Sequence, residues 1–332
     1  MIPSALPLID LHRHLDGSVR VQTILDMGVK YNLPLPAWTV DKLKPVVQVT
    51  SPQPGILAFF EKFKWQTLVM VDAGSIRRIA YENVEDASLG GLDYVELRFS
   101  PWFMAQAHQL DPKFVTQSVL EGVEDGRRDF GIPVGLIGIL SRTYGAETAM
   151  RELDVILSYR DNFIGIDLAG DEIHYPGDLF VPHFRRARDQ GLQITVHAGE
   201  AAGPESIWQA LKELGAERIG HAVHAPEDPK LMDYLREKQI PIESNLTSNV
   251  QTSTVRDYAS HPLRIFLEKD ICATINTDDP GISAIDLDFE LNTAAPLAGL
   301  SGEQIARARL NSLEAAFLAE PEKQKIRRKF NL

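Results

Sequence analysis

Cysteine is almost absent from this chain, in which Cys272 is the single cysteine among 332 residues. One cysteine cannot form an intramolecular disulfide and cannot supply a zinc site built from several thiolates. It also excludes the zinc-binding signature that combines H-x-E with P-C-x-x-C. We therefore expect a protein of the reducing cytoplasm, in which histidine and carboxylate side chains would be the metal ligands.

Long apolar runs and excess positive charge are also missing. No uninterrupted apolar stretch approaches the ~18–20 residues that span a bilayer, and residues 1–8 lack the basic and apolar regions of a signal peptide. Lys and Arg number 34 against 46 Asp and Glu, which gives a formal net charge of −12. Because phosphate-rich surfaces attract basic proteins, we expect neither a nucleic-acid nor a membrane partner. We interpret the basic segment 322–329 as the solvated end of a helix, and no obligatory protein partner is evident.

Short apolar runs typical of strands alternate with longer amphipathic segments typical of helices. The eight candidate strands are residues 8–12, 94–99, 134–140, 163–168, 193–197, 218–223, 240–244 and 271–276. This alternation requires parallel strands, and eight repeats predict an α/β fold of the (β/α)8 TIM-barrel type. A doubly wound open sheet competes with the barrel, but no G-x-G-x-x-G follows the first strand. No compositional break divides the chain, so we expect residues 1–332 to form a single barrel domain.

Two segments exceed what a barrel needs. Residues 301–332 are expected to form a C-terminal helical tail, and residues 37–70 form a helical excursion after the first strand. Within that excursion Ile56, Phe59, Phe60 and Phe63 are spaced to share one helix face. Such a stripe commonly packs into a core. The alternative is an apolar lid over a substrate pocket, since this excursion is long for a simple connection.

The motif His12-Arg13-His14-Leu15-Asp16-Gly17 follows the first candidate strand. Side chains alternate along a strand, so His12 and His14 are predicted to lie on the same face. Two imidazoles one pleat apart can bind one divalent metal ion. An isolated H-x-H would be weak evidence, and its weight depends on whether other strands end in residues of the same kind.

Other strands do end in this way, and in a barrel the carboxyl-terminal strand ends face one pocket. The further strand ends are 167–172 (DLAGDE), 197–200 (HAGE), 220–221 (GH) and 277–280 (TDDP). Three histidines and one aspartate from this set can supply the ligands of a zinc ion that keeps one position open for water. A zinc ion lowers the pKa of such water to roughly 7. The residue types therefore predict metal-assisted hydrolysis.

The remaining polar residues suit proton transfer and substrate binding. His221 is not needed as a ligand and could orient the water or accept its proton. Glu200, three residues after His197, could carry a proton between nucleophile and leaving group or onto a ring nitrogen. One carboxylate of Asp278-Asp279 can face the metal while its neighbour faces the substrate. Gly170 leaves a backbone N–H open to close approach by a planar ligand.

These motifs carry a resemblance to a known family. They are residues 12–17 (HRHLDG), 96–101 (ELRFSP), 167–172 (DLAGDE), 197–200 (HAGE), 219–221 (IGH), 246–249 (LTSN) and 276–280 (NTDDP). In this order, over nearly the whole chain, they strongly resemble the adenosine deaminase family of the metal-dependent amidohydrolase superfamily. The resemblance implies an enzyme that hydrolyses adenosine, and also 2′-deoxyadenosine, to inosine or deoxyinosine and ammonia in purine salvage.

The same resemblance implies a role for each site residue. It implies one Zn²⁺ per chain, with the ligands His12, His14, His197 and Asp278. The catalytic residues would be Glu200, which protonates N1 of the purine, and His221, which positions the attacking hydroxide. The substrate-binding residues would be Asp16 at the ribose 5′-hydroxyl, His14 near the sugar, Gly170 at N3 and Asp279 near N7. The family closes an apolar helix over this pocket, which favours the lid interpretation of residues 59–63.

The sequence departs from the family pattern at Ala222, where glycine is usual, and at Asn245, where a cysteine or another small residue is common. Three alternatives remain: deamination of another 6-aminopurine such as adenine or a modified adenosine, hydrolysis of esters, lactones or amides, and a non-catalytic nucleoside-binding relative. Asp16 argues against a nucleotide substrate because a carboxylate repels a 5′-phosphate. Relatives that hydrolyse esters usually have a bridging lysine, and no lysine lies near the predicted strand ends. A binding protein would need neither Glu200 nor His221.

Overall fold

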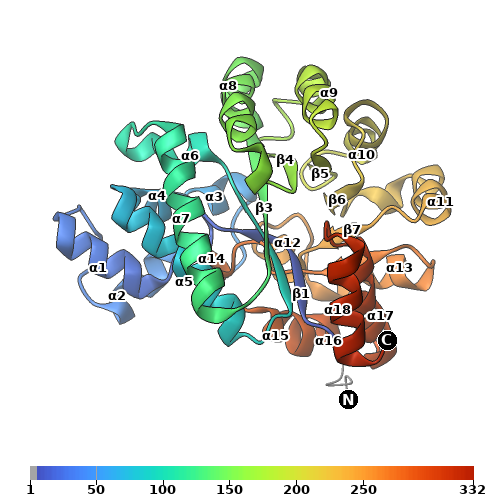
Figure 1. Ribbon diagram of the computed structural model, residues 1–332. Helices are drawn as coiled ribbons and strands as arrows, with labels where there is room; N and C mark the ends of the chain where they lie inside the picture. The colour runs from blue at the N-terminus through green and yellow to red at the C-terminus, as the bar shows by residue number, and fades with distance from the viewer. Residues whose placement is uncertain (1–5, 50) are drawn as a thin grey trace.

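Eight parallel strands form the centre of the molecule (Figure 1). The structure is a computed structural model, and it describes residues 6–49 and 51–332. The strands are β1 (Ile9–His14), β2 (Tyr94–Phe99), β3 (Val134–Ser141), β4 (Gly165–Ala169), β5 (Gln193–Ala198), β6 (Arg218–His221), β7 (Ile242–Ser244) and β8 (Ala273–Ile275). Each strand pairs with its neighbours in chain order, β1 to β8. Every residue of β1, β2 and β3 is buried, as expected of a sheet covered on both faces.

The ring closes through the residues that follow β8. Asp278 forms a parallel bridge with Arg13 of β1. Its N–H donates to the carbonyl of His12 at 2.8 Å, and its own carbonyl accepts from the N–H of His14 at 2.8 Å. The predicted (β/α)8 barrel is therefore confirmed, and the contact that closes it lies at the carboxyl-terminal ends of β1 and β8.

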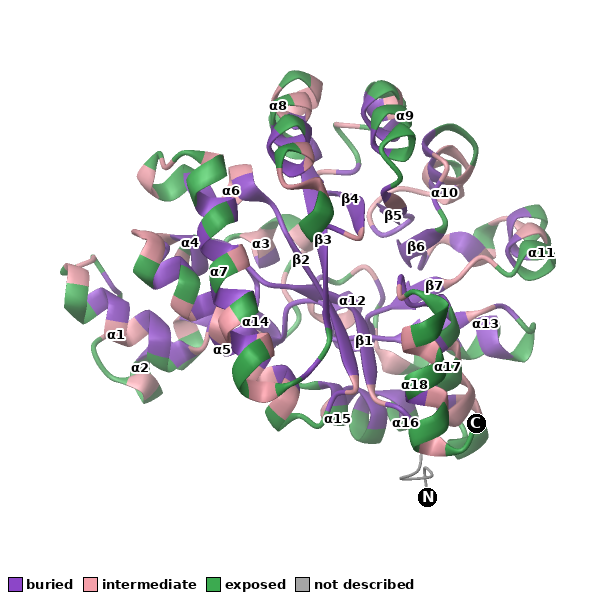
Figure 2. Cartoon of the chain, in the orientation of Figure 1, coloured by how far each residue is buried: buried purple, intermediate pink, exposed green. Residues whose placement is uncertain are grey.

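Helices surround the strands, with exposed residues on their outer faces and buried residues toward the sheet (Figure 2). They are α1 (Val21–Tyr31), α2 (Val40–Val47), α3 (Ile56–Phe60), α4 (Phe63–Leu68), α5 (Ala73–Leu89), α6 (Pro101–Ala105), α7 (Pro112–Phe130), α8 (Gly145–Ser158), α9 (Val181–Asp189), α10 (Pro204–Gln209), α11 (Pro229–Lys238), α12 (Leu246–Gln251), α13 (Leu263–Glu268), α14 (Pro280–Ser283), α15 (Leu287–Phe289), α16 (Ala295–Leu297), α17 (Gly302–Ala315) and α18 (Glu320–Phe330). Local signals set the ends of several of them. Asp72 and Ser75 form a capping box at the start of α5. Among the described residues, no helix is both long and apolar enough to cross a membrane.

The excursion after β1 differs from the single helix that its apolar stripe suggests. The helix ends at Phe60, and a second helix begins at Phe63. Between them the N–H of Lys62 donates to the carbonyl of Phe59, which closes a four-residue turn. The Lys62 ammonium donates to the carbonyl of Val46 at 2.9 Å. Phe59 and Phe63 are both buried, so the predicted apolar face is divided between α3 and α4.

The C-terminal helices close the end of the barrel opposite the strand ends that carry the histidines. Leu313 and Ile326 pack with Ile9, Leu11 and Tyr94 in a separate apolar cluster. This closure leaves the carboxyl-terminal end as the open end of the barrel.

Candidate functional site

The predicted site residues converge at the carboxyl-terminal end of the barrel. A cavity of about 250 Å³ opens there. Its lining includes His14, Asp16, Gly170, His197, Glu200, His221, Asp278 and Asp279. His12, which is completely buried, lies in the wall of the same site with its Nε2 atom 3.0 Å from Nε2 of His197. Residues from β1, β4, β5, β6 and the segment after β8 therefore share one site.

Four potential ligand atoms gather at the centre of this site. Nε2 of His197 lies 3.0 Å from Nε2 of His12 and 3.2 Å from Nε2 of His14. Oδ1 of Asp278 lies 3.2 Å and 3.3 Å from the same two atoms of His12 and His14. Ligand atoms about 2.0–2.1 Å from a tetrahedral zinc ion lie about 3.3–3.4 Å apart. The spacing and the three-nitrogen, one-oxygen composition of this group both fit zinc.

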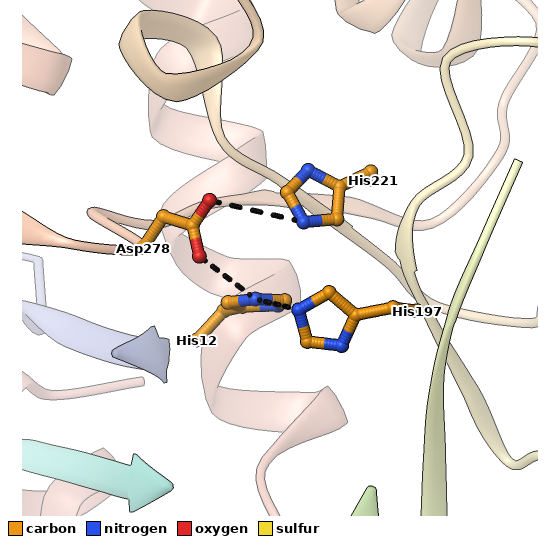
Figure 3. A group of neighbouring side chains, drawn as sticks. All are labelled: His12, His197, His221 and Asp278. Atoms are coloured by element: carbon orange, nitrogen blue, oxygen red, sulfur yellow. Dashed lines mark hydrogen bonds and ion pairs between the residues drawn. The ribbon is translucent and has the colours of Figure 1, made fainter. Parts of the chain in front are cut away.

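His221 belongs to the same cluster but lies farther out. One ligand atom from each of His12, His197, His221 and Asp278 lies within 4.8 Å of the others, and Figure 3 shows these side chains turned toward one another (Figure 3). Nε2 of His221 is 3.8 Å from Oδ2 of Asp278, the carboxylate oxygen turned away from His12. This separation suits a side chain that contacts a ligand of the metal rather than the metal itself.

Two buried carboxylates orient the histidine rings. Nδ1 of His12 donates to Glu243 at 2.7 Å, and Nδ1 of His197 donates to Asp167 at 2.9 Å. These bonds place the proton on Nδ1 and leave each Nε2 lone pair free toward the cluster. One guanidinium, that of Arg98, donates to both carboxylates at 2.8 Å.

The charges of this network hold both carboxylates in the ionised form. Burial alone would raise the pKa of Asp167, but the neighbouring His197 and Arg98 outweigh it and lower that pKa. Burial opposes ionisation of Glu243 in the same way, and Arg98 with Arg218 brings its pKa well below the usual value. Ionised carboxylates are the acceptors that the two histidine Nδ1–H groups require.

A chain of hydrogen bonds fixes the tautomer of His221. The N–H of Leu263 donates to Nδ1 of His261 at 3.1 Å, so Nε2 of His261 carries the proton and donates to Oδ1 of Asn249 at 3.1 Å. The Asn249 amide then donates to Nδ1 of His221 at 3.0 Å. Burial lowers the pKa of His221, which keeps its ring neutral. The remaining proton is therefore on Nε2, the atom that faces Asp278.

The two departures from the family pattern both lie against His221. Ala222 has φ +52° and follows His221 at φ +64°. This left-handed backbone explains why glycine is usual at this position, because only glycine adopts it without steric cost. Nδ2 of Asn245 lies 3.3 Å and 3.4 Å from the two ring nitrogens of His221. Oδ1 of Asn245 has no partner among residues 6–49 and 51–332.

Glu200 lies on the other side of His221, with Oε1 3.6 Å from its Nδ1 atom. The side chain is almost fully buried. Burial, and then the negative charge of Asp278, raise the pKa of Glu200 well above its usual value. A carboxyl group with this property can hold a proton near neutral pH and deliver it to a bound ligand.

Asp279 and Asp16 face the cavity beside the metal cluster. Oδ1 of Asp279 is buried and has no partner within the described part of the chain. The glycine of the first motif makes room for this carboxylate, because a Cβ atom on Gly17 would lie 1.8 Å from Oδ1 of Asp279. Asp16 accepts a long bond from the N–H of Ser100 at 3.4 Å. Both carboxyl groups can therefore hydrogen-bond a ligand.

An aromatic wall faces these polar groups. Phe59, Phe60 and Phe63 of the excursion line the cavity together with Phe103 of α6. The rings of Phe63 and Phe103 meet edge to face with their centroids 5.6 Å apart. A cavity with one apolar wall and one polar wall suits a flat, polar-edged ring system.

Comparison with known proteins agrees with this geometry. The profile of the adenosine deaminase family matches residues 7–331. The chain belongs to the adenosine deaminase family. It is 55% identical over 329 residues to the adenosine deaminase of Salmonella typhimurium strain LT2, and the match covers 99% of both chains. It is 56% identical over 329 residues to the adenosine deaminase of Escherichia coli O1:K1, again with 99% of both chains covered.

The fold is shared more widely than the sequence. The crystal structure of an adenine deaminase from Arthrobacter aurescens superposes with a TM-score of 0.91 at 23% identity, over 98% of each chain. At this identity the likeness concerns the barrel alone. Together, the comparisons confirm the family and the hydrolase class that the motifs predict.

The sequence reasoning missed the residues behind the site. Asp167, Glu243 and Asn249 have no role predicted from the sequence, although the first two are carboxylates within fully buried strands. A charged residue inside a buried strand requires a partner, and this signal was available in the sequence. The identity of that partner was not, because His12 and Glu243 are 231 residues apart.

Proposed function

We propose that this chain catalyses the zinc-dependent hydrolytic deamination of adenosine to inosine and ammonia, and that 2′-deoxyadenosine is a second substrate. The observation that carries the proposal is the group of four ligand atoms in which Nε2 of His12 and Nε2 of His14 each lie 3.0–3.3 Å from His197 and Asp278. Glu200 and His221 lie beside this group. Full-length identity of 55–56% to curated adenosine deaminases supports the choice of substrate.

His12, His14, His197 and Asp278 would hold the zinc ion. When bound, zinc makes water more acidic and so provides a nucleophile near neutral pH. The Nδ1 bonds of His12 and His197 to buried carboxylates orient both rings before a metal arrives. This preorganisation supports a resident metal ion, one per chain.

His221 and Glu200 would act on opposite sides of the reacting carbon. Nε2–H of His221 would hydrogen-bond the attacking oxygen and orient it, a role that the proton on Nε2 permits. Glu200 would donate its proton to N1 of the purine as C6 becomes tetrahedral. The resulting carboxylate would then accept the proton of the hydroxyl group added to C6 and pass it to the departing amine. The raised pKa of Glu200 supports this assignment, because the carboxyl group must be protonated at the start.

The remaining contacts would orient the nucleoside. Asp279 would donate a hydrogen bond to N7, an acceptor, because burial and the negative charge of Asp278 raise the pKa of Asp279 well above its usual value. The N–H of Gly170 would donate to N3, and Asp16 would bind the 5′-hydroxyl with His14 close to the sugar. The Asp16 carboxylate would also repel a 5′-phosphate. This electrostatic cost favours the nucleoside over AMP.

We further propose that residues 37–70 form a lid of one continuous barrel domain. Phe59, Phe60 and Phe63 line the cavity from the excursion, and the ring of Phe63 packs against Phe103 of α6. An apolar lid excludes water from the reacting ring, which strengthens the hydrogen bonds beneath it. The single cysteine supports a cytoplasmic location, and the net charge of −12 makes nucleic acid and membrane partners unfavourable.

The test is an ultraviolet absorbance assay of purified, zinc-loaded enzyme with adenosine, 2′-deoxyadenosine, adenine and AMP measured side by side. We expect turnover of both nucleosides, and at least about 100-fold lower kcat/KM for AMP, because the buried Asp16 would face the 5′ position of the sugar. Preferential turnover of adenine or AMP would contradict the proposal and favour the alternative of another 6-aminopurine. Absence of any turnover with bound zinc would favour a binding protein.

A further inference from the structure

The carboxylate of Glu172 reaches from the segment after β4 into the loop that carries Glu200. Its Oε1 atom accepts the N–H of Gly199 at 2.6 Å and the hydroxyl of Ser206. Its Oε2 atom accepts three further N–H groups, those of residues 200, 201 and 202, at 3.2, 2.8 and 3.0 Å. One buried side chain therefore satisfies four consecutive backbone donors of a single loop.

This arrangement is a backbone nest filled by a side-chain anion. Gly199 has φ +68°, and a Cβ atom there would lie 2.4 Å from Cδ1 of Ile207. The left-handed glycine turns successive N–H groups toward the same point, and such a concave set of donors binds anions. Without a buried anion, these N–H groups would have to find other acceptors or water.

The carbonyl side of the same turn is held separately. The guanidinium of Arg142, which follows β3, donates to the carbonyl of His197 at 2.8 Å. The peptides on both sides of Ala198 are thus fixed by charged side chains from the two preceding strand ends. The Glu200 side chain makes no comparable contact within the described part of the chain, and its Oε1 atom lies 3.6 Å from Nδ1 of the neutral His221 ring.

We propose that Glu172 is a positioning residue for the deamination reaction, which holds the backbone of residues 199–202 so that the Glu200 carboxyl group points at the substrate ring. The inference rests on the proposed function of Glu200. Proton transfer requires donor and acceptor atoms within hydrogen-bond reach, about 2.6–3.2 Å. A loop released from its anchor loses this alignment while the cavity and the metal ligands stay in place.

Glu172→Gln is the direct test, because an amide has only one acceptor oxygen and would turn its NH2 group toward backbone donors. We expect kcat for adenosine to fall about 100-fold, since small misplacements of reacting groups cost this much. KM is expected to change by less than about threefold, because binding contacts are kept. Bound zinc should remain at the parental stoichiometry.

Hydrogen exchange measured by mass spectrometry supplies a readout that is independent of activity. The peptide containing residues 199–202 should exchange at least about tenfold faster in Glu172→Gln than in the parent, because the NH2 group of glutamine cannot accept the N–H hydrogen bonds that one of the carboxylate oxygens accepts. Glu205→Gln is the matched control. It removes an equal charge from an exposed position next to the same loop and should leave both kcat and exchange at parental values.

Two results in Glu172→Gln would each overturn the inference. One is parental hydrogen exchange at residues 199–202, and the other is a kcat within about twofold of the parent. If the Gln variant does not fold, Ser206→Ala decides by the same two measurements, with a smaller increase in exchange and a severalfold loss in kcat expected. Glu172→Asp keeps the charge and should recover part of kcat. A parent enzyme that does not deaminate adenosine would refute the proposed function, while the exchange data would still decide whether Glu172 holds the loop.

Discussion

The N–H of His14 donates to the carbonyl of Asp278 at 2.8 Å, and the N–H of Asp278 donates to the carbonyl of His12 at 2.8 Å. The segment after β8 is therefore paired with the end of β1 that carries both histidines. The Asp278 carboxylate thereby reaches Nε2 of both His12 and His14. The backbone at Asp278 is left-handed, with φ +62°, a conformation that costs a non-glycine residue on the order of 1 kcal/mol or more. The hydrogen bonds that close the barrel therefore also bring the donors of the metal site together.

Removal of the metal should abolish activity and lower Tm. Dialysis against a chelator removes an ion that binds only the folded state, so the stabilisation from binding is lost. Zinc should restore both activity and Tm. Magnesium should restore neither, because it prefers an all-oxygen site. Metal content by atomic absorption, kcat and Tm are measured on the same samples, and full activity of metal-free protein would contradict the assignment.

Glu200→Gln should keep zinc and adenosine affinity but reduce kcat by about 10²–10⁴-fold, the usual contribution of general acid–base catalysis. The amide cannot release a proton to the purine ring. Steady-state kinetics and zinc content measure the two effects separately. Near-parental kcat would show that Glu200 does not transfer the proton.

Asp16→Ala should damage turnover of adenosine far more than turnover of 5′-deoxyadenosine. The carboxylate is buried, and we propose that it binds the 5′-hydroxyl, which 5′-deoxyadenosine lacks. A hydrogen bond to a charged group contributes about 1.5–3 kcal/mol, or roughly 10- to 150-fold in kcat/KM. Equal losses with both substrates would place the 5′-hydroxyl elsewhere.

Asn249 and Asn245 offer a matched pair of amides around His221. Asn249→Asp replaces the amide that donates to Nδ1 of His221 by a carboxylate that accepts. This change favours the tautomer of His221 with the proton on Nδ1 instead of Nε2. We therefore expect kcat to fall at least about tenfold. Asn245→Ala removes an amide with weak geometry and an unpartnered oxygen, and should change kcat by less than about threefold. Equal effects in both variants would show that the tautomer does not limit the reaction. Kinetics of both variants at parental zinc content provide the measurement.

Glu290 should make the fold less stable at high pH. Burial raises the pKa of this carboxyl group to about 8, and Oε2 has no partner in the described part of the chain. The folded state keeps its proton above the pH at which the unfolded state loses it. The stabilisation is therefore complete below about pH 4.5 and is lost as the pH rises through about 8. Between pH 6 and 9 the loss should be on the order of 2 kcal/mol.

Glu290→Gln cannot ionise, so its free energy of unfolding should fall less over the same pH interval than that of the parent. Urea unfolding at several pH values between 6 and 9 measures the difference. Parallel pH dependences of parent and variant would show that Glu290 does not titrate in this range. Because the comparison is a difference between two proteins, the other titrating groups cancel.

The sequence determined which residues could do chemistry, because the polar residues of an apolar repeat fall at the strand ends. Positions 12, 14, 197, 200, 221 and 278 follow from alternation and the barrel rule, and the motifs around them identify the family. The number and order of the strands follow in the same way. These features are local, since each depends on residues that are neighbours in the chain.

Tertiary structure decided everything that depends on closure of the ring. Only the closed barrel brings Glu243 to His12 and pairs the backbone of Asp278 with those of His12 and His14. Each of these contacts joins residues that are more than two hundred positions apart in the chain. The split at Glu61–Lys62 and the reach of Glu172 into the Glu200 loop were equally invisible, because no periodicity encodes a contact between distant segments. A local pattern specifies what a residue can do, but the free energy of packing the whole ring selects which partner it meets.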